Sequence, residues 1–516
     1  MARQGMVIAY WAERRAAHPA IISPAGSRTF AELNGRANQL VRGLRQRGLQ
    51  AGDAVALMCG NRPEYAEVYA ACMRAGWRLT PINWHLTGGE AGYIVADCEA
   101  KAFVAEAALA ATAREAARYA PSVTTRIAVG GSIDGFDDYE RALTDQDAAN
   151  IDDPTPGGTM LYTSGTTGRP KGVYREQSPP ENLKIWGYRE DHVHLCTGPL
   201  YHAAPLGMSL HIPLVCGVGV VVMDRWDAEA TLQLIEAHRV THTHMVPTMF
   251  HRLLALPAAT RRKYDVSSLF AVVHGAAPCP VNVKHAMIDW FGPVIFEYYG
   301  ATEGAGTLVD SKTWLQKPGT VGKPQPPDQV FVGDEAATKL SPHAIGLVWL
   351  KAPAQGRFRY FKDDAKTNAS YRGDHFTLGD MGYLDDDGYL FLTDRSANLI
   401  ISGGVNIYPA EVDGVLIDHP AVGDVATIGV PSEEWGEEVK AVVELKTGVQ
   451  QSPALASELI DFCRARLPHF KCPRSVDFID KLPRLDSGKV SKHLLRERYR
   501  QPSEAHLDRP SDNEEA

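Results

Sequence analysis

The residues from Met160 to Gly172 combine the side-chain types that bind a polyphosphate. The stretch reads Met160-Leu-Tyr-Thr-Ser-Gly-Thr-Thr-Gly-Arg-Pro-Lys-Gly172. Its glycines permit tight turns that bring backbone N–H groups close to an anion, and Lys171 adds a point charge. The G-x-x-x-x-G-K-[ST] spacing of P-loop NTPases is absent. Composition alone would favour a flexible polar linker. The order of an apolar strand, a polar turn and a lysine favours a phosphate-binding loop instead.

Thr163 to Lys171 resembles the phosphate-loop signature of the adenylate-forming enzymes, which include acyl-CoA synthetases, luciferases and the adenylation domains of peptide synthetases. Four further motifs follow in the family's order, and the resemblance covers roughly residues 25 to 495. It implies an enzyme that binds ATP and forms an acyl-AMP intermediate. The phosphate-loop residues that it implies are Thr163, Ser164, Gly165, Thr166, Thr167, Gly168 and Lys171.

The segment Tyr299-Gly-Ala-Thr-Glu303 resembles a second family motif. The resemblance implies that Tyr299 stacks on adenine, that Thr302 binds the α-phosphate, and that Glu303 is the metal ligand for Mg²⁺. One carboxylate together with phosphate oxygens is a usual set of ligands for Mg²⁺. Taken alone, the segment could equally be a strand end followed by a solvated turn. The adenine pocket is expected to include a small-residue segment that follows another strand: Gly275, Ala276 and Ala277.

Two positions near the end of the main region resemble the family's ribose contacts. Leu378-Gly-Asp380 is similar to a T-G-D motif in which Leu378 replaces the threonine, and it implies that Asp380 binds the ribose hydroxyls. Arg395 matches a second ribose or phosphate contact just before a hinge. The hinge position is Ala397, followed by Asn398, where the family usually has Asp or Lys. Hinges need not be charged, so a pivot is still expected at residues 395–398.

The segment Pro483-Arg-Leu-Asp-Ser-Gly-Lys489 resembles the family's C-terminal loop, which implies that Lys489 is catalytic. A lysine is a compact cation on a flexible stem and can reach both a carboxylate and a phosphate. The loop Ile401 to Pro409 resembles the one that faces the CoA thiol once the C-terminal domain rotates. The CoA-binding residues that the resemblance implies are Ser402, Gly403, Gly404, Trp435 and Lys471.

The acyl substrate is expected next to Tyr201-His-Ala-Ala204. His202 matches the catalytic aromatic residue that closes over the acyl carboxylate in CoA synthetases. Peptide-synthetase domains carry an aspartate near this point for the substrate ammonium, and its absence here argues against an amino acid. The stretch has no Arg or Lys to pair with a second carboxylate, so a lipophilic monoacid is expected. The small or apolar pocket wall consists of Ala203, Ala204, Leu206, Gly207 and Met208.

Composition fits this interpretation. A net charge of −9 without a block of Lys or Arg argues against nucleic acid or an anionic membrane as the main partner. The eight scattered cysteines include no C-x-x-C pair, which predicts reduced thiols in a cytoplasmic protein. Ile212 to Met223 contains Pro213, is too short to span a bilayer, and is predicted to be a buried strand, so no integral membrane segment is expected. A homodimer remains open.

Alternating helical and strand patterns position these residues. The expected helices include residues 29–47, Pro63 to Ala75 and Ala228 to His238; a short strand is expected at residues 192–195 and longer buried strands at 54–58, 241–246 and 269–274. This alternation predicts an α/β fold. Length suggests about three compact lobes. We expect a large N-terminal adenylation domain over residues 1–394 that includes a β-rich lobe from about Gly319 to Leu392, a small mobile α+β C-terminal domain over 399–500, and a disordered tail over 501–516.

The sequence therefore predicts an AMP-forming acyl-CoA ligase that uses ATP, Mg²⁺ and CoA on a fatty, aryl or steroid-like acid and releases AMP and pyrophosphate. One alternative is a fatty acyl-AMP ligase that loads a carrier protein, although the insertion typical of that group is absent. Another is a catalytically silent nucleotide-binding protein, against which Lys171, Glu303 and Lys489 together argue. His238, His242 and His244 could suggest a metal site, but no carboxylate or Cys completes a ligand set.

Overall fold

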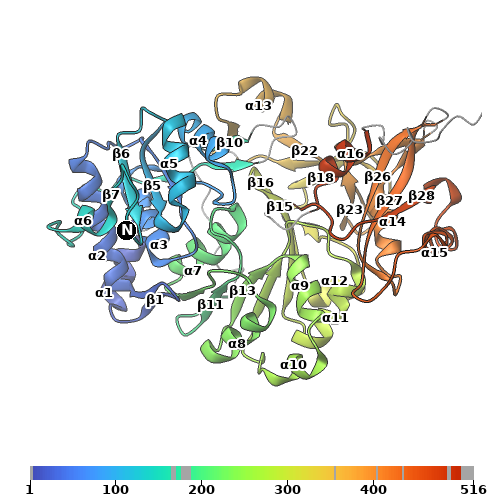
Figure 1. The fold of residues 1–516 in the computed structure, drawn as a ribbon, viewed down its shortest axis with the longest axis horizontal. Coiled ribbons are helices and arrows are strands. Elements are labelled where there is room, and N and C mark those ends of the chain that lie inside the picture. Colours follow the sequence, from blue (N-terminus) through green and yellow to red (C-terminus); the bar gives the residue numbers. More distant parts are fainter. Residues whose placement is uncertain are drawn as a thin grey trace, which may run out of the picture. The chain divides into compact units, whose positions relative to one another are not determined.

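A computed structural model describes residues 4–163, 170–175, 187–353, 356–402, 405–432, 435–484 and 490–500 of the chain, without the side chains of Ala305, Arg395, Ala397 and Arg500. Figure 1 shows its helices and strands along the sequence. Packing divides the chain into two compact units. The larger unit is Met1–Val330 with Leu350–Phe376, and the smaller is Phe331–Trp349 with Thr377–Ala516.

The larger unit contains a nine-stranded sheet in the order β17-β16-β15-β14-β13-β11-β12-β1-β2. Pairing is parallel from β1 to β15, while β2, β16 and β17 pair antiparallel at the two ends. Its strands are β1 (Pro19–Ser23), β2 (Gly26–Thr29), β11 (Val193–Cys196), β12 (Gly219–Val222), β13 (His242–Met245), β14 (Ala271–His274), β15 (Ile295–Ala301), β16 (Gly304–Asp310) and β17 (Lys323–Pro324).

A second sheet of the larger unit has six parallel strands in the order β7-β6-β5-β3-β4-β8. Its strands are β3 (Ala54–Met58), β4 (Arg78–Pro81), β5 (Ala100–Glu106), β6 (Thr125–Val129), β7 (Asp137–Asp138) and β8 (Gly158–Thr159). A third, small sheet in the order β20-β10-β9 consists of β9 (Leu161–Thr163), β10 (Lys171–Tyr174) and β20 (Arg359–Tyr360).

Helices α1 to α6 gather around the six-stranded sheet, and α8 to α12 lie beside the nine-stranded sheet (Figure 1). The helices of the larger unit are α1 (Val7–Arg14), α2 (Phe30–Gln46), α3 (Pro63–Ala75), α4 (Gly88–Asp97), η2 (Ala107–Leu109), α5 (Ala110–Tyr119), α6 (Tyr139–Leu143), the π-helix η4 (Pro205–His211), α7 (Ile212–Val215), α8 (Ala228–His238), α9 (Pro247–Leu254), α10 (Ala258–Lys263), α11 (Val281–Phe291), α12 (Ser311–Gln316) and α13 (Asp364–Ser370).

One hydrophobic core joins the two large sheets. Ile21 and Val220 of the nine-stranded sheet belong to the same buried cluster as Val55 and Val104 of the six-stranded sheet. This shared core explains why the described chain packs as two units rather than the three that its length suggests, because two sheets buried against each other do not separate into independent lobes.

The sheet order β18-β19-β22-β21, with β23 paired to β22, spans the division between the two units. Its strands are β18 (Val330–Gly333), β19 (Gly346–Lys351), β21 (Tyr371–Arg372), β22 (His375–Leu384) and β23 (Leu390–Arg395). The smaller unit also contains a sheet in the order β25-β24-β27-β26, with β28 paired to β27. Its elements are η5 (Ser396–Asn398), β24 (Ile400–Ser402), β25 (Val405–Ile407), α14 (Pro409–Leu416), β26 (Val422–Ser432), β27 (Gly436–Leu445), α15 (Pro453–Arg464), η6 (His469–Lys471), β28 (Ser475–Phe478) and α16 (Lys492–Arg500).

The α/β fold class with a large N-terminal and a smaller C-terminal region is confirmed, and α3 and α8 have the predicted bounds. Helix α2 begins after Thr29, which forms a capping box with Glu32. The prediction of one buried strand from Ile212 to Met223 is wrong. Residues Ile212–Val215 form α7, the chain turns at Gly217 with φ 73°, and only Gly219–Val222 is a strand. A continuous apolar run does not reveal such a boundary, because both elements are buried.

The described residues contain no helix that is both long and apolar enough to cross a membrane. The same residues hold no group of three or more His, Cys, Asp and Glu side chains arranged to bind a metal ion by themselves.

Candidate active site

The small sheet of the larger unit brings the two ends of the phosphate loop together. Strands β9 and β10 pair antiparallel, with Thr163 opposite Lys171 and Tyr162 opposite Gly172. The apolar strand that the sequence predicts before the polar turn is therefore present. The loop residues Ser164, Gly165, Thr166, Thr167 and Gly168 lie outside the described residues. Thr163 and Lys171 are the paired positions nearest to these residues in the sequence.

Lys171 forms an ion pair with Asp363, a residue that the sequence did not single out. Asp363 also caps α13 by accepting from the backbone N–H of Lys366. Its contacts with Lys171 and with that N–H lower the pKa of the Asp363 carboxyl. Burial, with the charge of Lys171 next, lowers the pKa of Lys366. Lys171 is thus paired with the carboxylate of Asp363, and Lys366 lies close by. A polyphosphate can replace this carboxylate as the anionic partner of Lys171.

Thr302 and Glu303 form the turn between β15 and β16. The register pairs Gly300 with Ala305 and Ala301 with Gly304. Glu303 is only 7% exposed. Its Oε1 accepts a hydrogen bond of 2.9 Å from the hydroxyl of Tyr360. Burial and the Glu303 charge raise the pKa of Tyr360, so this hydroxyl keeps its proton and donates it. The carboxylate expected to bind Mg²⁺ is held in one orientation.

Arg175 fixes the backbone of the same turn. Its guanidinium donates to the carbonyl oxygen of Glu303 and lies 3.5 Å from that of Thr302. Burial lowers the pKa of Arg175. Arg175 directly follows β10, which also carries Lys171, and β10 pairs with β20, which carries Tyr360. Two strands of the small sheet, β10 and β20, therefore supply the residues that hold the Thr302–Glu303 turn. The sequence analysis did not single out Arg175.

The expected adenine pocket lies at the carboxyl ends of neighbouring parallel strands. Gly275 to Ala277 follow β14, Tyr299 is in β15, and the register places His274 beside Glu297. An added Cβ on Gly275 would lie 2.6 Å from the carbonyl oxygen of Tyr298. Ala276 has a φ of 67°, an uncommon conformation for alanine that is typical of functional sites. The carboxyl edge of an open parallel sheet is where α/β proteins bind ligands.

The residues expected to contact the acyl group lie just before η4 and within it. Ala203, Ala204, Gly207 and Met208 are all partly exposed. Leu206, in contrast, is 3% exposed and belongs to the hydrophobic core. The ring of His202 lies 4.5 Å from that of Tyr201, centroid to centroid.

In the smaller unit, β22 and β23 pair Asp380 directly with Arg395. The structure thus places the two expected ribose contacts on neighbouring positions of one sheet. The expected hinge follows at once as η5, Ser396–Asn398. Asn398 donates to Asp394 at 2.9 Å, and Arg496 donates to the carbonyl of Asn398 at 2.7 Å. The hinge expected at 395–398 concerns motion, and packing alone does not test it.

Asp394 also faces a buried lysine from the last helix. Lys492 Nζ lies 2.8 Å from Asp413 and 3.7 Å from Asp394. Burial works against the Lys492 charge, but the two carboxylates raise its pKa overall. Burial raises the pKa of Asp413, and Lys492 opposes that shift.

Two of the expected CoA contacts lie close together in the smaller unit. Ser402 pairs with Gly436, the neighbour of Trp435. Trp435 is 37% exposed, and the guanidinium of Arg474 lies 4.7 Å from its ring centroid. Lys471 is in an ion pair with Glu411 instead. Gly403, Gly404 and Lys489 lie outside the described residues, and so does the predicted tail over 501–516.

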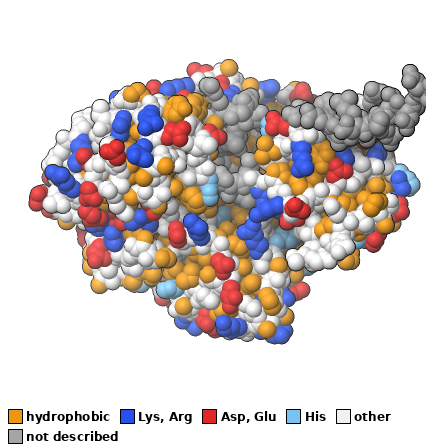
Figure 2. All heavy atoms as spheres, viewed as in Figure 1, with side chains coloured by type: hydrophobic (Ala, Val, Ile, Leu, Met, Phe, Trp, Pro, Cys, Tyr) orange, Lys and Arg blue, Asp and Glu red, His pale blue; other side chains and the backbone are white. Residues whose placement is uncertain are grey.

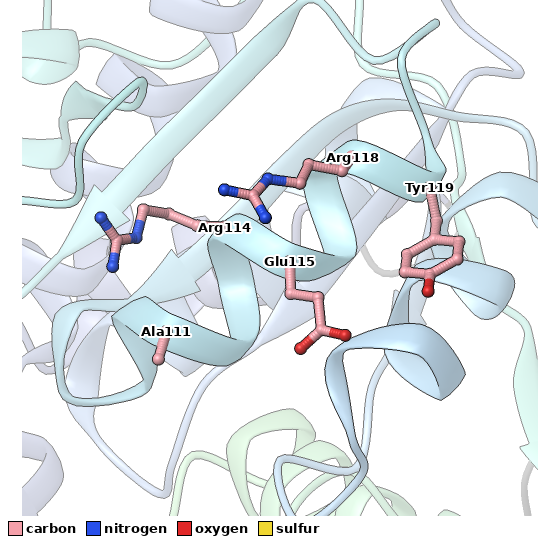
Figure 3. Close-up of a pocket in the computed structure, with 5 residues that line it drawn as sticks. All are labelled: Ala111, Arg114, Glu115, Arg118 and Tyr119. Carbon is pink, nitrogen blue, oxygen red and sulfur yellow. The ribbon is translucent and has the colours of Figure 1, made fainter.

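A surface depression on α5 contains none of the expected site residues. It is lined by Ala111, Arg114, Glu115, Arg118 and Tyr119. Figure 3 shows the two arginines on one side of the helix and Glu115 and Tyr119 on another. Added Cβ atoms on Gly88 and Gly92 of α4 would lie 2.4 Å and 2.6 Å from the Cβ atoms of Glu115 and Tyr119. These two side chains therefore pack the helix pair. Among the described residues, Figure 2 shows acidic and basic side chains interspersed over the face in view.

Two protein-family models together match most of the chain. The AMP-binding enzyme model matches residues 8–358, and the AMP-binding enzyme C-terminal domain model matches residues 411–489. The chain belongs to the AMP-binding enzymes of the adenylate-forming superfamily, in the CoA-ligase branch. It is accordingly an enzyme, an AMP-forming acid–thiol ligase.

Curated relatives extend over the whole fold. A feruloyl-CoA synthase from Amycolatopsis sp is 34% identical over 504 residues, covering 95% of this chain and 98% of the relative. A 2-succinylbenzoate–CoA ligase from Bacillus licheniformis is 32% identical over 494 residues, with 92% and 96% covered. Among solved structures, ATP-bound MatB from Rhodopseudomonas palustris has a TM-score of 0.82 at 29% identity, covering 96% of this chain and 99% of that one.

Proposed function

We propose that this ligase activates a lipophilic carboxylic acid, with an aryl acid favoured over fatty and steroid-like ones. The acid and ATP would give acyl-AMP and pyrophosphate, and the CoA thiol would then displace AMP. The names of the relatives favour an aryl acid, since feruloyl-CoA synthase, 2-succinylbenzoate–CoA ligase and indoleacetate–CoA ligase all refer to aromatic acids. The half-buried wall of Ala203, Ala204 and Met208 supports an apolar substrate.

The single observation that carries this proposal is the convergence of the phosphate hairpin and the Thr302–Glu303 turn on one small sheet. A carboxylate and an α-phosphate are both anions, and at about 4 Å they repel by roughly 4 kcal/mol with an effective dielectric near 20. Cations and donors must therefore be in place before the reaction. Lys171 with the hairpin would bind the triphosphate, Tyr299 and Gly275 to Ala277 would hold adenine, and Thr302 would bind the α-phosphate.

Mg²⁺ fits the carboxylate of Glu303. In the part of the chain that the structure describes, Tyr360 is the one residue that donates to this carboxylate, and it occupies Oε1. An oriented, buried carboxylate with a second oxygen to offer is a usual partner for Mg²⁺ beside phosphates. The ion would neutralise charge on the phosphate oxygens. In the smaller unit, Asp380 and Arg395 would bind the ribose, Lys489 would approach the reacting groups, and Ser402, Gly403, Gly404, Trp435 and Lys471 would bind CoA after rotation about residues 395–398.

Hydroxylamine trapping tests the proposal directly. Pools of fatty, aryl and steroid-like acids are incubated with ATP, Mg²⁺ and hydroxylamine, and the hydroxamates are identified. We expect ATP-dependent product from the aryl pool. No hydroxamate from any pool would exclude the proposed activity. Lys489→Ala should lower formation at least roughly 10²-fold, the scale of losing one preorganised electrostatic donor. The matched variant Lys481→Ala removes an exposed lysine of the same segment and should behave like wild type. A Lys489→Ala rate close to wild type would refute the role of that lysine.

A second candidate acceptor is a carrier protein. A fatty acid–[acyl-carrier-protein] ligase from Streptomyces coeruleorubidus is 30% identical over 504 residues and covers 95% of this chain. Supplying either free CoA or a carrier protein bearing phosphopantetheine to the same acyl-AMP would distinguish the two. A thioester on CoA supports the acyl-CoA ligase, and a thioester on the carrier protein alone supports the ligase that loads a carrier protein.

A further inference from the structure

Aromatic side chains gather along β11 (Val193–Cys196) and β13 (His242–Met245) of the nine-stranded sheet, starting at the amino ends of these strands and outside the nucleotide-binding residues. His194 of β11 and His242 of β13 are register partners, and His244 follows two residues later on the same face of β13. The ring of Tyr188 stacks on that of His242 at 4.0 Å between centroids. The hydroxyl of Tyr298 lies 3.3 Å from His244 Nε2. All of these residues belong to the larger unit.

One nitrogen of this cluster has no partner in the described part of the chain. His194 Nδ1 lies 2.7 Å from the hydroxyl of Tyr188, but His194 Nε2 is buried without any hydrogen bond. His194 is 2% exposed. A buried polar atom left unpaired is costly, so native structures rarely keep one without a reason. The cavity beside it, of about 10 Å³, is lined by His194, His242, His244, Met208 and Val273. About 10–15 Å³ is the space that one water-sized polar group needs.

The cavity adjoins the wall expected to contact the acyl group. Met208 lines the cavity and also belongs to that wall, because η4 continues directly from His202 to Ala204. On the other side, Tyr298 lies against Gly275, which begins the segment expected at the adenine. A substrate that runs from His202 along η4 would bring its end remote from the carboxylate to the cavity.

The cluster favours a neutral group that can both donate and accept. Burial lowers the pKa of His194 well below its usual value and that of His244 to about 4, so both imidazoles are neutral near pH 7. No described Asp, Glu, Lys or Arg lines the cavity to pair with a charge, and an unpaired charge there would be costly. The tautomer of His194 decides whether Nε2 donates or accepts, and a hydroxyl matches either state.

We propose that the substrate of this ligase carries a hydroxyl group at the end remote from its carboxylate, and that this hydroxyl enters the cavity and hydrogen-bonds to His194 Nε2. This inference rests on the proposed function, since it concerns the acid that the same site activates. It also refines the expectation of an entirely lipophilic acid, because the far end of the apolar wall is polar.

Matched pairs of acids test the inference. We would measure kcat/KM for benzoate, phenylacetate and cinnamate, each with and without a 4-hydroxyl, because the three lengths cover different distances to the cavity. In wild type, the hydroxyl should raise kcat/KM by at least about tenfold in one pair, since a site built around a substrate hydroxyl rejects the analogue that lacks it. In His194→Leu, which removes the polar atoms at similar volume, the ratio for that pair should fall to about one.

Two further variants distinguish recognition from damage to the core. His194→Gln keeps a polar group and should retain part of the hydroxyl preference. Tyr188→Phe keeps the ring stack on His242 but removes the hydroxyl beside His194 Nδ1, so it should lower the ratio even if His194→Leu fails to fold. Activity on unsubstituted acids with no hydroxyl preference in any pair, or a preference unchanged in the variants, overturns the inference and leaves the proposed function intact. Hydroxamate from none of the acids overturns both.

Discussion

In the larger unit, the residues expected at the phosphate, here called the phosphate end, are charged. The residues around the cavity next to the expected acyl wall, here called the acyl end, are neutral. At the phosphate end, Lys171 is ion-paired with Asp363 and the guanidinium of Arg175 holds the Thr302–Glu303 turn. Around the small cavity at the acyl end, in contrast, His194 and His244 are neutral through burial, and their neighbours are tyrosines. The charged residues lie on or next to the small sheet β20-β10-β9, and the histidines lie on β11 and β13 of the nine-stranded sheet.

This difference indicates how each end obtains its specificity. At the charged end, an incoming phosphate can replace a carboxylate as the partner of a lysine, because both are anions that form charge-assisted hydrogen bonds. A neutral, buried end has no such exchange and discriminates through one hydrogen bond and through shape. Mutations at the two ends should therefore have different consequences, with losses in catalysis at the charged end and changes in preference or in pH-dependent stability at the neutral end.

Among changes in the larger unit, the largest loss of activity is expected from Arg175→Ala. Removing the guanidinium leaves the carbonyls of Thr302 and Glu303 without their donor, and the turn loses its fixed position. We expect adenylate formation to fall roughly 10- to 100-fold, within the range for losing a group that orients an active site. Pyrophosphate exchange measures it. Arg175→Lys should recover only part of the rate, while Arg118→Ala on the exposed face of α5 should match wild type. Exchange at the wild-type rate in Arg175→Ala would contradict the positioning role.

A smaller effect is expected from Tyr360→Phe. This change removes the hydrogen bond to Glu303 Oε1 and leaves the ring in place. The apparent Mg²⁺ requirement of adenylate formation should rise by roughly 3- to 10-fold, just below the roughly 10- to 100-fold cost of losing a residue that orients a metal ligand. A Mg²⁺ titration of the exchange rate measures it. Tyr371→Phe is the matched control, because the Tyr371 hydroxyl donates to the backbone carbonyl of Phe358 instead. Equal Mg²⁺ titration curves for wild type, Tyr360→Phe and Tyr371→Phe would argue against Glu303 as the Mg²⁺ ligand.

A third effect concerns stability at the neutral end. The folded-state pKa of His244 is lowered to about 4, from an ordinary value of 6.5. Between these values the unfolded chain binds a proton that the folded chain does not, so stability is complete above pH 6.5 and falls as the pH drops toward 4. For this one histidine, the free energy of unfolding should be about 2 kcal/mol lower at pH 5.0 than at pH 7.5. Denaturant titrations at both values measure it. His244→Gln should lose that part of the dependence, and an identical pH dependence in the two proteins would rule out a buried neutral His244.

Much of the fold could be predicted from the sequence, because its signals are local. The bounds of α3 and α8 follow from Pro63, which begins α3, and from Asp227, which caps α8. The shared core was not predictable, since contacts between the two large sheets join residues far apart in the chain. The interpretation of the whole run Ile212 to Met223 as one strand was wrong for the opposite reason, because α7 and β12 are both buried and apolar and no polar residue marks the change.

The candidate site was predictable where a motif is contiguous and not where it is assembled in space. Tyr299 to Glu303 and Thr163 with Lys171 are short patterns whose order indicates their chemistry. Asp363 and Tyr360 reach the same place from nearly two hundred residues further along the chain than Lys171, and their local sequence shows only a helix cap and a short strand. The histidines of β13 were noticed as a possible metal set. The structure places them at the border of a cavity.

The ion pairs of Lys492 give the last helix a role that its position at the end of the chain does not suggest. In the smaller unit, α16 supplies the positive charge that two buried aspartates require, and its Arg496 binds the backbone of the expected pivot. A truncation that removes α16 would take away the lysine that faces the carboxylates of Asp394 and Asp413, and it would also remove Arg496 from the backbone of Asn398 at the expected pivot. A largely buried carboxylate that loses its paired cation is costly, so the smaller unit should be destabilised.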